Sequence, residues 1–159
     1  MFDAGEVKTN QIAILNHNVF IVWKPEYNLG IPIIDEQHRG VVTIINSLHF
    51  GIRNDYIEDM LAAVVDMIYD YTQIHFQVEE DFLKKTKFPE IESHHGLHNE
   101  LTQKLNKIGK SSILVKDPFR FLDFMKEWWI NHICVEDHLY RNYLSSLEGK
   151  SSIIPLATK

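Results

Sequence analysis

The stretch MLAAVVDMIYDYTQIHFQVEEDF, residues 60–82, decides the fold. Its apolar side chains recur every three or four positions, as at Met60 and Val64, which is the spacing of one face of an α-helix. Two polar residues, His75 and Glu79, continue that same stripe, four positions apart. The stretch therefore predicts a long helix that points a histidine and a carboxylate toward the interior of the protein.

The same period appears in three further parts of the chain. We expect Asp35 to cap a first helix, Phe88–Pro89 to end the second, Gly109 to end the third and Asp117–Pro118 to open the fourth. The expected helices cover residues 36–53, 55–86, 89–109 and 118–149. Four long helices with short connections predict an all-α protein, an up-down-up-down antiparallel four-helix bundle with an irregular N-terminal arm. The expected division is an arm at 1–22, the bundle at 23–147 and a C-terminal tail at 148–159.

Composition narrows the class of protein. A chain of 159 residues is typical of one domain, and a net charge of −6 argues against a nucleic-acid partner, which would require a basic face. The single cysteine, Cys134, cannot form an intrachain disulfide, which favours a reducing compartment. We find no apolar run long enough to span a membrane and no signal-peptide pattern in the first ten residues. We therefore expect a cytoplasmic protein without a membrane partner.

Seven residues that can bind metals fall on the inward stripes of the four expected helices. In an antiparallel bundle the first and third helices begin where the second and fourth end, so these residues can share one layer near one end of the bundle. The pairs His75/Glu79 and His94/His98 are each spaced by four, so each pair projects from one face of its helix. The seven residues are His38, His75, Glu79, His94, His98, His132 and Asp137.

The last pair, His132 and Asp137, has a spacing of five within WWINHICVEDHLY, residues 128–140. On a regular α-helix this spacing separates two side chains by about 140°. Either the two side chains approach a common centre from two sides, or a π-helical turn brings them onto one face.

Seven buried polar groups without partners would cost several kcal/mol each, which makes a metal centre the simplest explanation. Seven ligands exceed a tetrahedral zinc site. Two six-coordinate metals with five histidines, two bridging carboxylates and a bridging oxide or hydroxide would leave one position open. Histidine and carboxylate ligands suit iron. The expected walls of the open position are the side chains of Phe76, Trp128, Trp129 and Ile133, which suggests that a small apolar gas binds there.

These motifs resemble the hemerythrin family, and bacterial hemerythrins in particular. The resemblance covers roughly residues 20–145. It rests on W-x3-Y-x2-G-I at 23–31, IDEQH ending at His38, HFQVEE at 75–80, HHGLH at 94–98 and WWINHICVEDHLY at 128–140. The family's seven iron-binding positions all carry the matching residue type.

The resemblance implies that His94, His98 and His132 bind one iron ion and that His38 and His75 bind the other, which keeps an open position for molecular oxygen. It implies that Glu79 and Asp137 bridge the two ions of a non-haem, oxo- or hydroxo-bridged di-iron centre. The implied function is reversible binding of O2, for storage or delivery to an oxygen-using enzyme, rather than catalysis. Two alternatives stay open: an oxygen or redox sensor that signals to a protein partner, and a di-iron oxidase or peroxidase.

Several neighbours of the ligands have expected roles. Trp129 stands where the family commonly has leucine beside the oxygen pocket, so it either narrows access for oxygen or only fills volume. Gln37, Tyr71 and Tyr140 are candidates for hydrogen bonds to the ligands, since an imidazole that binds a metal needs a partner for its other nitrogen. We expect the remaining histidines not to bind iron, and Glu80 to belong to a solvated acidic run.

Overall fold

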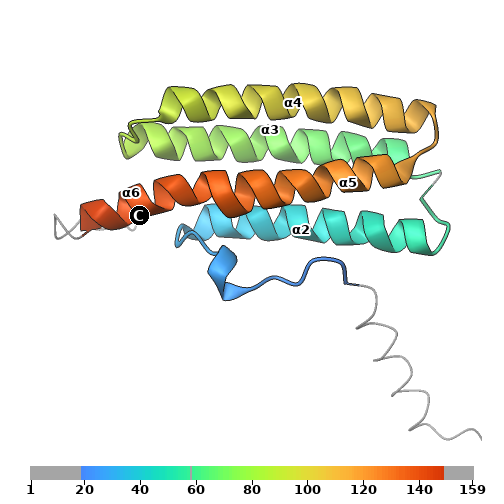
Figure 1. The fold of residues 1–159 in the computed structure, drawn as a ribbon, viewed down its shortest axis with the longest axis horizontal. Helices are drawn as coiled ribbons and strands as arrows, with labels where there is room; N and C mark the ends of the chain where they lie inside the picture. Colours follow the sequence, from blue (N-terminus) through green and yellow to red (C-terminus); the bar gives the residue numbers. More distant parts are fainter. Residues whose placement is uncertain (1–18, 58, 149–159) are drawn as a thin grey trace, which may run out of the picture.

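The computed structural model describes residues 19–57 and 59–148 and shows a four-helix bundle (Figure 1). The part of the chain it describes contains helices and no strands, so the all-α prediction is confirmed. Three bundle helices are continuous, and the fourth consists of three consecutive segments. The bounds are α2 at Pro32–Arg53, α3 at Leu61–Lys85, α4 at Ile91–Leu114, and the fourth helix as α5 at Pro118–Trp128, the π-helix η2 at Trp129–Glu136 and α6 at Asp137–Glu148.

The four helices form a closed ring in which each neighbour runs in the opposite direction. Helix α3 packs against α2 and α4, and α5 packs against α4 and α2. Figure 1 shows the alternation of direction, with the starts of α2 and α4 and the ends of α3 and α6 at the same end of the bundle. The predicted up-down-up-down topology is present, and it brings together the helix ends that carry the seven polar residues.

The start of α2 differs from the prediction that Asp35 caps a helix beginning at 36. The helix begins at Pro32, whose fixed φ angle suits a first helical position, and Asp35 lies inside its first turn. The Asp35 carboxylate instead accepts hydrogen bonds from the backbone N–H groups of Leu29, at 2.6 Å, and Gly30, at 3.1 Å. Asp35 therefore holds the preceding loop against the helix.

Helices α3 and α4 also have other ends than predicted. Helix α3 begins at Leu61 rather than 55, after a turn in which Asp55 adopts a positive φ of 57°. Helix α4 continues through Gly109 to Leu114. A Cβ atom at Gly109 would lie 2.6 Å from Cγ1 of Val65 on α3. Gly109 is therefore a point of close helix packing and not a helix end.

The fourth helix settles how His132 and Asp137 are related. Asp117 caps its start as predicted, by accepting a hydrogen bond from the N–H of Arg120 at 3.1 Å. In η2 the backbone N–H of Asp137 donates to the carbonyl of His132, five residues earlier. The π-helical alternative is therefore the one present, and it brings these two side chains toward the same centre.

The described part of the N-terminal arm runs along the outside of α2. The backbone N–H groups of Phe20 and Ile21 both donate to the Asn46 side chain, at 3.0 and 2.8 Å. Nearer the bundle end, Trp23 packs against Trp129 of η2 with ring centroids 5.7 Å apart. Most of the predicted arm (1–18) and of the predicted tail (149–159) lies outside the described residues.

The interior is divided into two apolar clusters. The larger one fills most of the bundle and includes Val41, Ile45 and Phe76, and the smaller one, with Ile34 and Leu83, fills the end where α2 and α4 begin. The seven polar residues lie between members of the two clusters along the helices, with Phe76 and Ile133 of the larger cluster among them, so their layer has apolar side chains on both sides.

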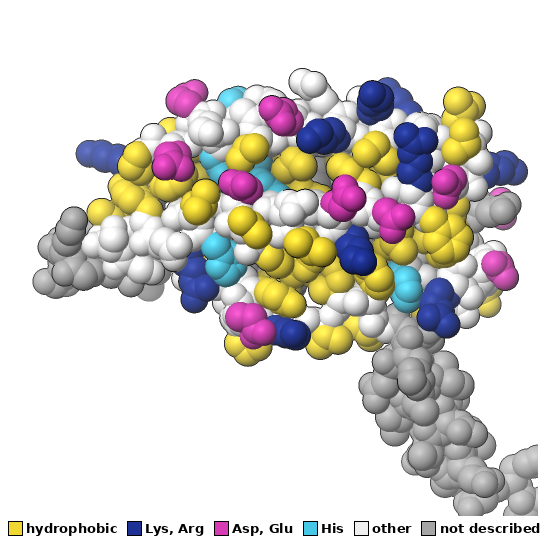
Figure 2. Space-filling model, in the orientation of Figure 1, with side chains coloured by type: hydrophobic (Ala, Val, Ile, Leu, Met, Phe, Trp, Pro, Cys, Tyr) yellow, Lys and Arg dark blue, Asp and Glu magenta, His cyan; other side chains and the backbone are white. Residues whose placement is uncertain are grey.

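On the face drawn in Figure 2, acidic and basic side chains surround a band of hydrophobic ones, and several basic side chains gather toward the upper right. Among the described residues no helix combines the length and the apolar character needed to cross a bilayer.

Candidate metal centre

The seven predicted residues all lie in one buried layer. Their exposed fractions run from 0% to 5%, although every one of them is ionisable. Helix α2 supplies one histidine, α3 a histidine and a glutamate, α4 two histidines, and the fourth helix a histidine and an aspartate. The side chains form two groups that share Glu79, and within each group one potential ligand atom per residue lies within 4.8 Å of all the others.

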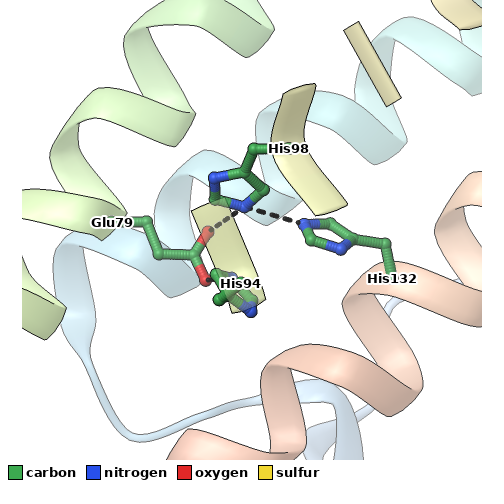
Figure 3. A group of neighbouring side chains, drawn as sticks. All are labelled: Glu79, His94, His98 and His132. Atoms are coloured by element: carbon green, nitrogen blue, oxygen red, sulfur yellow. Dashed lines mark hydrogen bonds and ion pairs between the residues drawn. The ribbon is translucent and has the colours of Figure 1, made fainter. Parts of the chain in front are cut away.

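The first group contains Glu79, His94, His98 and His132 (Figure 3). The Nε2 atom of His94 lies 3.0 Å from Oε1 of Glu79. The Nε2 atom of His98 lies 3.2 Å from Nε2 of His132 and 3.7 Å from Oε2 of Glu79. Three imidazole nitrogens and a carboxylate thus converge from three helices on one small volume.

The second group contains His38, His75, Glu79 and Asp137. The Nε2 atom of His38 lies 3.3 Å from Oδ2 of Asp137, and the Nε2 atom of His75 lies 3.3 Å from Oε2 of Glu79. Metal–ligand bonds of about 2.1 Å at right angles place neighbouring ligand atoms roughly 3 Å apart. The contacts in both groups are close to this separation.

The two carboxylates connect the groups. Glu79 directs Oε1 to His94 of the first group and Oε2 to His75 of the second. Asp137 directs Oδ1 to His132, at 3.5 Å, and Oδ2 to His38. Asp137 therefore offers one oxygen atom to the histidines of each group, and Glu79 contacts both groups, since its Oε2 atom lies near His98 as well as His75. Carboxylates that contact both groups are suited to serve as bridging ligands.

The unpaired atoms in this layer fit a metal centre. Within the described residues, the ring nitrogens of His38, the Nε2 atom of His75, Oε2 of Glu79 and both carboxylate oxygens of Asp137 are buried without a hydrogen-bond partner. Leaving a buried polar atom unpaired costs about 1–3 kcal/mol, and more for a charged group. Metal ions bound by one nitrogen of each ring and by the carboxylate oxygens would remove most of this cost, and imidazole with carboxylate is a donor set that suits iron.

Burial also sets the protonation of the candidate ligands. It lowers the pKa of His38, His75 and His98 to about 4, against a smaller opposing effect of the Glu79 carboxylate. Burial likewise holds the pKa of His132 well below its usual value. Neutral imidazole is the form that binds metals, so these four rings are ready to bind at neutral pH.

The pKa values of the remaining candidate ligands depend on the charges of their neighbours. For His94, the hydrogen bond to Glu79 and the neighbouring carboxylates outweigh burial and raise its pKa. Burial and the Glu79 charge raise the pKa of Asp137 well above its usual range. For Glu79, the surrounding histidines outweigh the effect of burial and lower the pKa. Without metal the two carboxylates therefore differ, with Glu79 charged and Asp137 disfavoured as an anion.

In two candidate ligand histidines the Nδ1 atom, which points away from the centre, has a partner. The Nδ1 atom of His75 lies 3.1 Å from the side-chain Oε1 atom of Gln37, and the Tyr71 hydroxyl donates to the backbone carbonyl of Gln37 at 3.0 Å. The Nδ1 atom of His98 lies 2.9 Å from Oε1 of Glu80. Gln37 and Tyr71 were expected near the ligands. Glu80 was not: it is only 7% exposed, so its assignment to a solvated acidic run was wrong.

Aromatic side chains enclose the layer on the side of the larger apolar cluster. The Phe76 ring stacks on His98 with centroids 3.8 Å apart, and Trp128 stacks on His132 at 6.3 Å. Ile133 is fully buried. A cavity of about 10 Å³, room for roughly one water molecule, lies beside Phe76 and Trp128. These side chains keep bulk water away from the layer.

Trp129 and Tyr140, the other two predicted neighbours, face different surroundings. Trp129 meets Trp23 and Tyr27 of the N-terminal segment, with ring centroids 5.7 and 5.3 Å away. Tyr140 is fully buried, and its ring lies edge-on to His94 at 5.7 Å. Burial and the charges of Glu79 and Asp137 raise the pKa of Tyr140 well above its usual value, so its hydroxyl stays protonated beside the ligand carboxylates.

The other described histidines and the cysteine lie outside both groups. His95 has a 51% exposed side chain that contacts Glu80, and His49 stacks on Phe20 with ring centroids 4.7 Å apart. His138 is partly buried beside Arg141. Burial raises the pKa of Cys134 to about 11, so its thiol is protonated at neutral pH, and Cys134 belongs to neither group.

Comparison with known proteins agrees with this geometry. Residues 29–144 match the family described as Hemerythrin HHE cation binding domain. A bacteriohemerythrin of Clostridium acetobutylicum is 30% identical over 125 residues, which cover 75% of this chain and 97% of that protein. A bacteriohemerythrin of Stenotrophomonas maltophilia is 26% identical over 129 residues, covering 79% and 82%. A hemerythrin-like protein of Naegleria gruberi is 27% identical over 125 residues, covering 77% and 92%.

Proposed function

The chain belongs to the hemerythrin family, and from this premise we propose that it binds molecular oxygen reversibly at a non-haem di-iron centre. The single observation that carries the proposal is the position of two carboxylates between two groups of imidazoles. Glu79 and Asp137 each contact histidines of both groups, and each group has its own imidazoles. Two ions held close together are the natural occupants of such a site.

The proposed assignment gives the two ions unequal ligand sets. His94, His98 and His132 hold one ion, while His38 and His75 hold the other, and Glu79 and Asp137 serve both. The second ion has one imidazole fewer, so it has the position available to a small ligand. Iron in this site supplies the electrons that oxygen takes up reversibly on binding.

The protein contributes in two ways to reversible binding. It keeps bulk water away from the site, and it supplies mostly neutral imidazoles as ligands. Phe76, Trp128 and Ile133 exclude water, which limits the irreversible loss of electrons to the solvent. The proposed role is storage of oxygen or its delivery to an oxygen-using enzyme in the cytoplasm.

Anaerobic loading with ferrous iron, followed by air, tests the proposal. We expect two iron ions per chain and a visible charge-transfer band that appears with oxygen and disappears under vacuum over repeated cycles. A band that decays in one irreversible oxidation would contradict reversible binding and would favour a sensor or an oxidase. Fewer than two iron ions per chain would contradict the di-iron centre itself.

Two histidine variants provide a matched control. His75→Ala removes a fully buried imidazole from the second group, so we expect loss of iron and of the oxygen-dependent band. His49→Ala removes an imidazole that stacks on Phe20 outside both groups, so we expect it to retain both iron ions. Equal iron contents in the two variants would contradict the ligand assignment.

A further inference from the structure

Glu80 forms a contact that the proposed function does not use. It follows Glu79 on α3 but faces α4, where its Oε1 atom lies 2.9 Å from Nδ1 of His98 and 2.9 Å from Nδ1 of His95. The Nζ atom of Lys84 lies 4.0 Å from the other carboxylate oxygen. Glu80 thus joins a buried histidine of the first group to an exposed histidine at the surface.

The His98 ring is fixed from two directions. Glu80 contacts one edge through Nδ1, and Phe76 stacks on the face of the ring with an interplanar angle of 10°. With Nδ1 directed to Glu80, the Nε2 atom points to His132 and Glu79 in the first group. A ring held at both its edge and its face has little freedom to turn away from a metal ion.

The second group lacks an equivalent carboxylate contact at His75. There the partner of Nδ1 is the neutral Gln37 amide oxygen. A carboxylate that accepts a hydrogen bond from the Nδ1–H group fixes the tautomer of an imidazole. It also makes the Nε2 atom a stronger electron-pair donor to a metal ion than a neutral amide partner does. Stronger donation stabilises the higher oxidation state of a bound metal ion.

The geometry points to Glu80 as a positioning residue that directs Nε2 of His98 into the first group and makes the iron ion held there harder to reduce than the ion held by His38 and His75. This inference rests on the proposed di-iron function. It gives the two iron ions different electronic roles: the first is biased toward the ferric state, and the second keeps the position for oxygen.

The test compares Glu80→Gln with Asp81→Asn in the full-length, iron-loaded protein. Both substitutions remove one negative charge, one residue apart, but Asp81 is exposed and contacts Gln77 rather than a ligand. For Glu80→Gln we expect a higher midpoint potential by spectroelectrochemistry and roughly 10–100-fold weaker retention of ferric iron against a chelator. For Asp81→Asn we expect both quantities to match wild type.

A purely structural role would lower the melting temperature of Glu80→Gln but leave the midpoint potential of the folded protein unchanged, and that result would overturn the inference. Equal potential shifts in Glu80→Gln and Asp81→Asn would also overturn it, because they would reflect net charge alone. Should Glu80→Gln fail to fold, Glu80→Asp provides the measurement: it keeps the charge and draws the carboxylate back from His98. The potential must then rise, and an unchanged value overturns the inference.

The same experiment separates this inference from the proposed function. Wild-type protein that retains no iron contradicts the di-iron centre, and the inference falls with it. Wild-type protein that retains two iron ions, together with a Glu80→Gln variant of unchanged potential and iron retention, contradicts only the role of Glu80.

Discussion

Two glycines of α4 provide a measurement of how closely α4 packs against α3. At Gly96 an added Cβ atom would meet nothing within 4 Å. At Gly109 it would lie 2.6 Å from Cγ1 of Val65 and 3.7 Å from Cε2 of Phe121. Both positions are helical, so replacement by alanine brings the same gain in helix propensity, and only the packing differs.

The expected free energies follow from these distances. Alanine is favoured over glycine inside a helix by about 1 kcal/mol, so Gly96→Ala should raise the free energy of unfolding by about that amount. At Gly109 the same gain meets an overpacking cost of about 1–3 kcal/mol, because Val65 must move. Gly109→Ala should therefore be less stable than Gly96→Ala by about 1–3 kcal/mol.

The assay is urea unfolding of the iron-free variants, followed by circular dichroism at several temperatures. Repeating Gly109→Ala in a Val65→Ala background isolates the contact, since that background removes the Cγ1 atom that the new methyl group would meet. We expect the cost of Gly109→Ala to disappear there. If both alanine variants stabilise wild-type protein equally, α4 does not approach α3 as closely as the structure shows, and the explanation for Gly109 is wrong.

Three further predictions concern the metal layer. Deleting the exposed Val135 should convert η2 into regular α-helix and leave His132 and Asp137 four residues apart on one face. We then expect metal analysis to find both iron ions retained. Loss of iron would show that the π-helix itself is required. Trp129→Leu should speed oxygen dissociation or autoxidation in stopped-flow measurements, and unchanged rates would leave this residue a packing role only. In the iron-free protein His38, His75 and His98 have a pKa of about 4 when folded. Below a pH of about 6.5 they therefore bind fewer protons in the folded protein than in the unfolded chain. The free energy of unfolding should therefore fall as pH drops from about 6.5 to 4, and a flat profile in urea titrations would contradict the burial of these rings.

Sequence reasoning could place the seven polar residues in one layer because helical period predicts which side chains face inward and antiparallel topology predicts which helix ends meet. His75 and Glu79 could be assigned to the interior from their spacing with the apolar residues around them. Glu80 could not, because the covering of that side chain depends on α4, whose His95 and His98 lie over it. The period of one helix carries no information about what a neighbouring helix covers.

Helix ends were harder to predict than helix faces for a related reason. A lone glycine such as Gly109 is a common signal for a helix end, yet here it allows two helices to approach closely. Asp35 has the residue type of an N-cap, but its carboxylate binds the N–H groups of the loop before the helix. Both residue types are common at helix ends. Here a contact with another part of the folded protein, rather than a helix end, explains the residue.

The position of the polar layer between two apolar clusters explains why folding and iron binding are expected to depend on each other. Each helix passes from one cluster to the other through the layer, so no helix can move its ligand without moving apolar side chains as well. The two clusters hold the imidazoles and carboxylates close together, although several of their polar atoms lack a hydrogen-bond partner. Burying these atoms unpaired costs free energy, and metal ions bound between them would remove that cost. Iron bound as we propose would contact all four helices and remove that cost, so its binding energy would add to the free energy of unfolding. If the proposed ligand assignment holds, one ion alone would leave the imidazoles of the other group unpaired, so we expect the two ions to bind together.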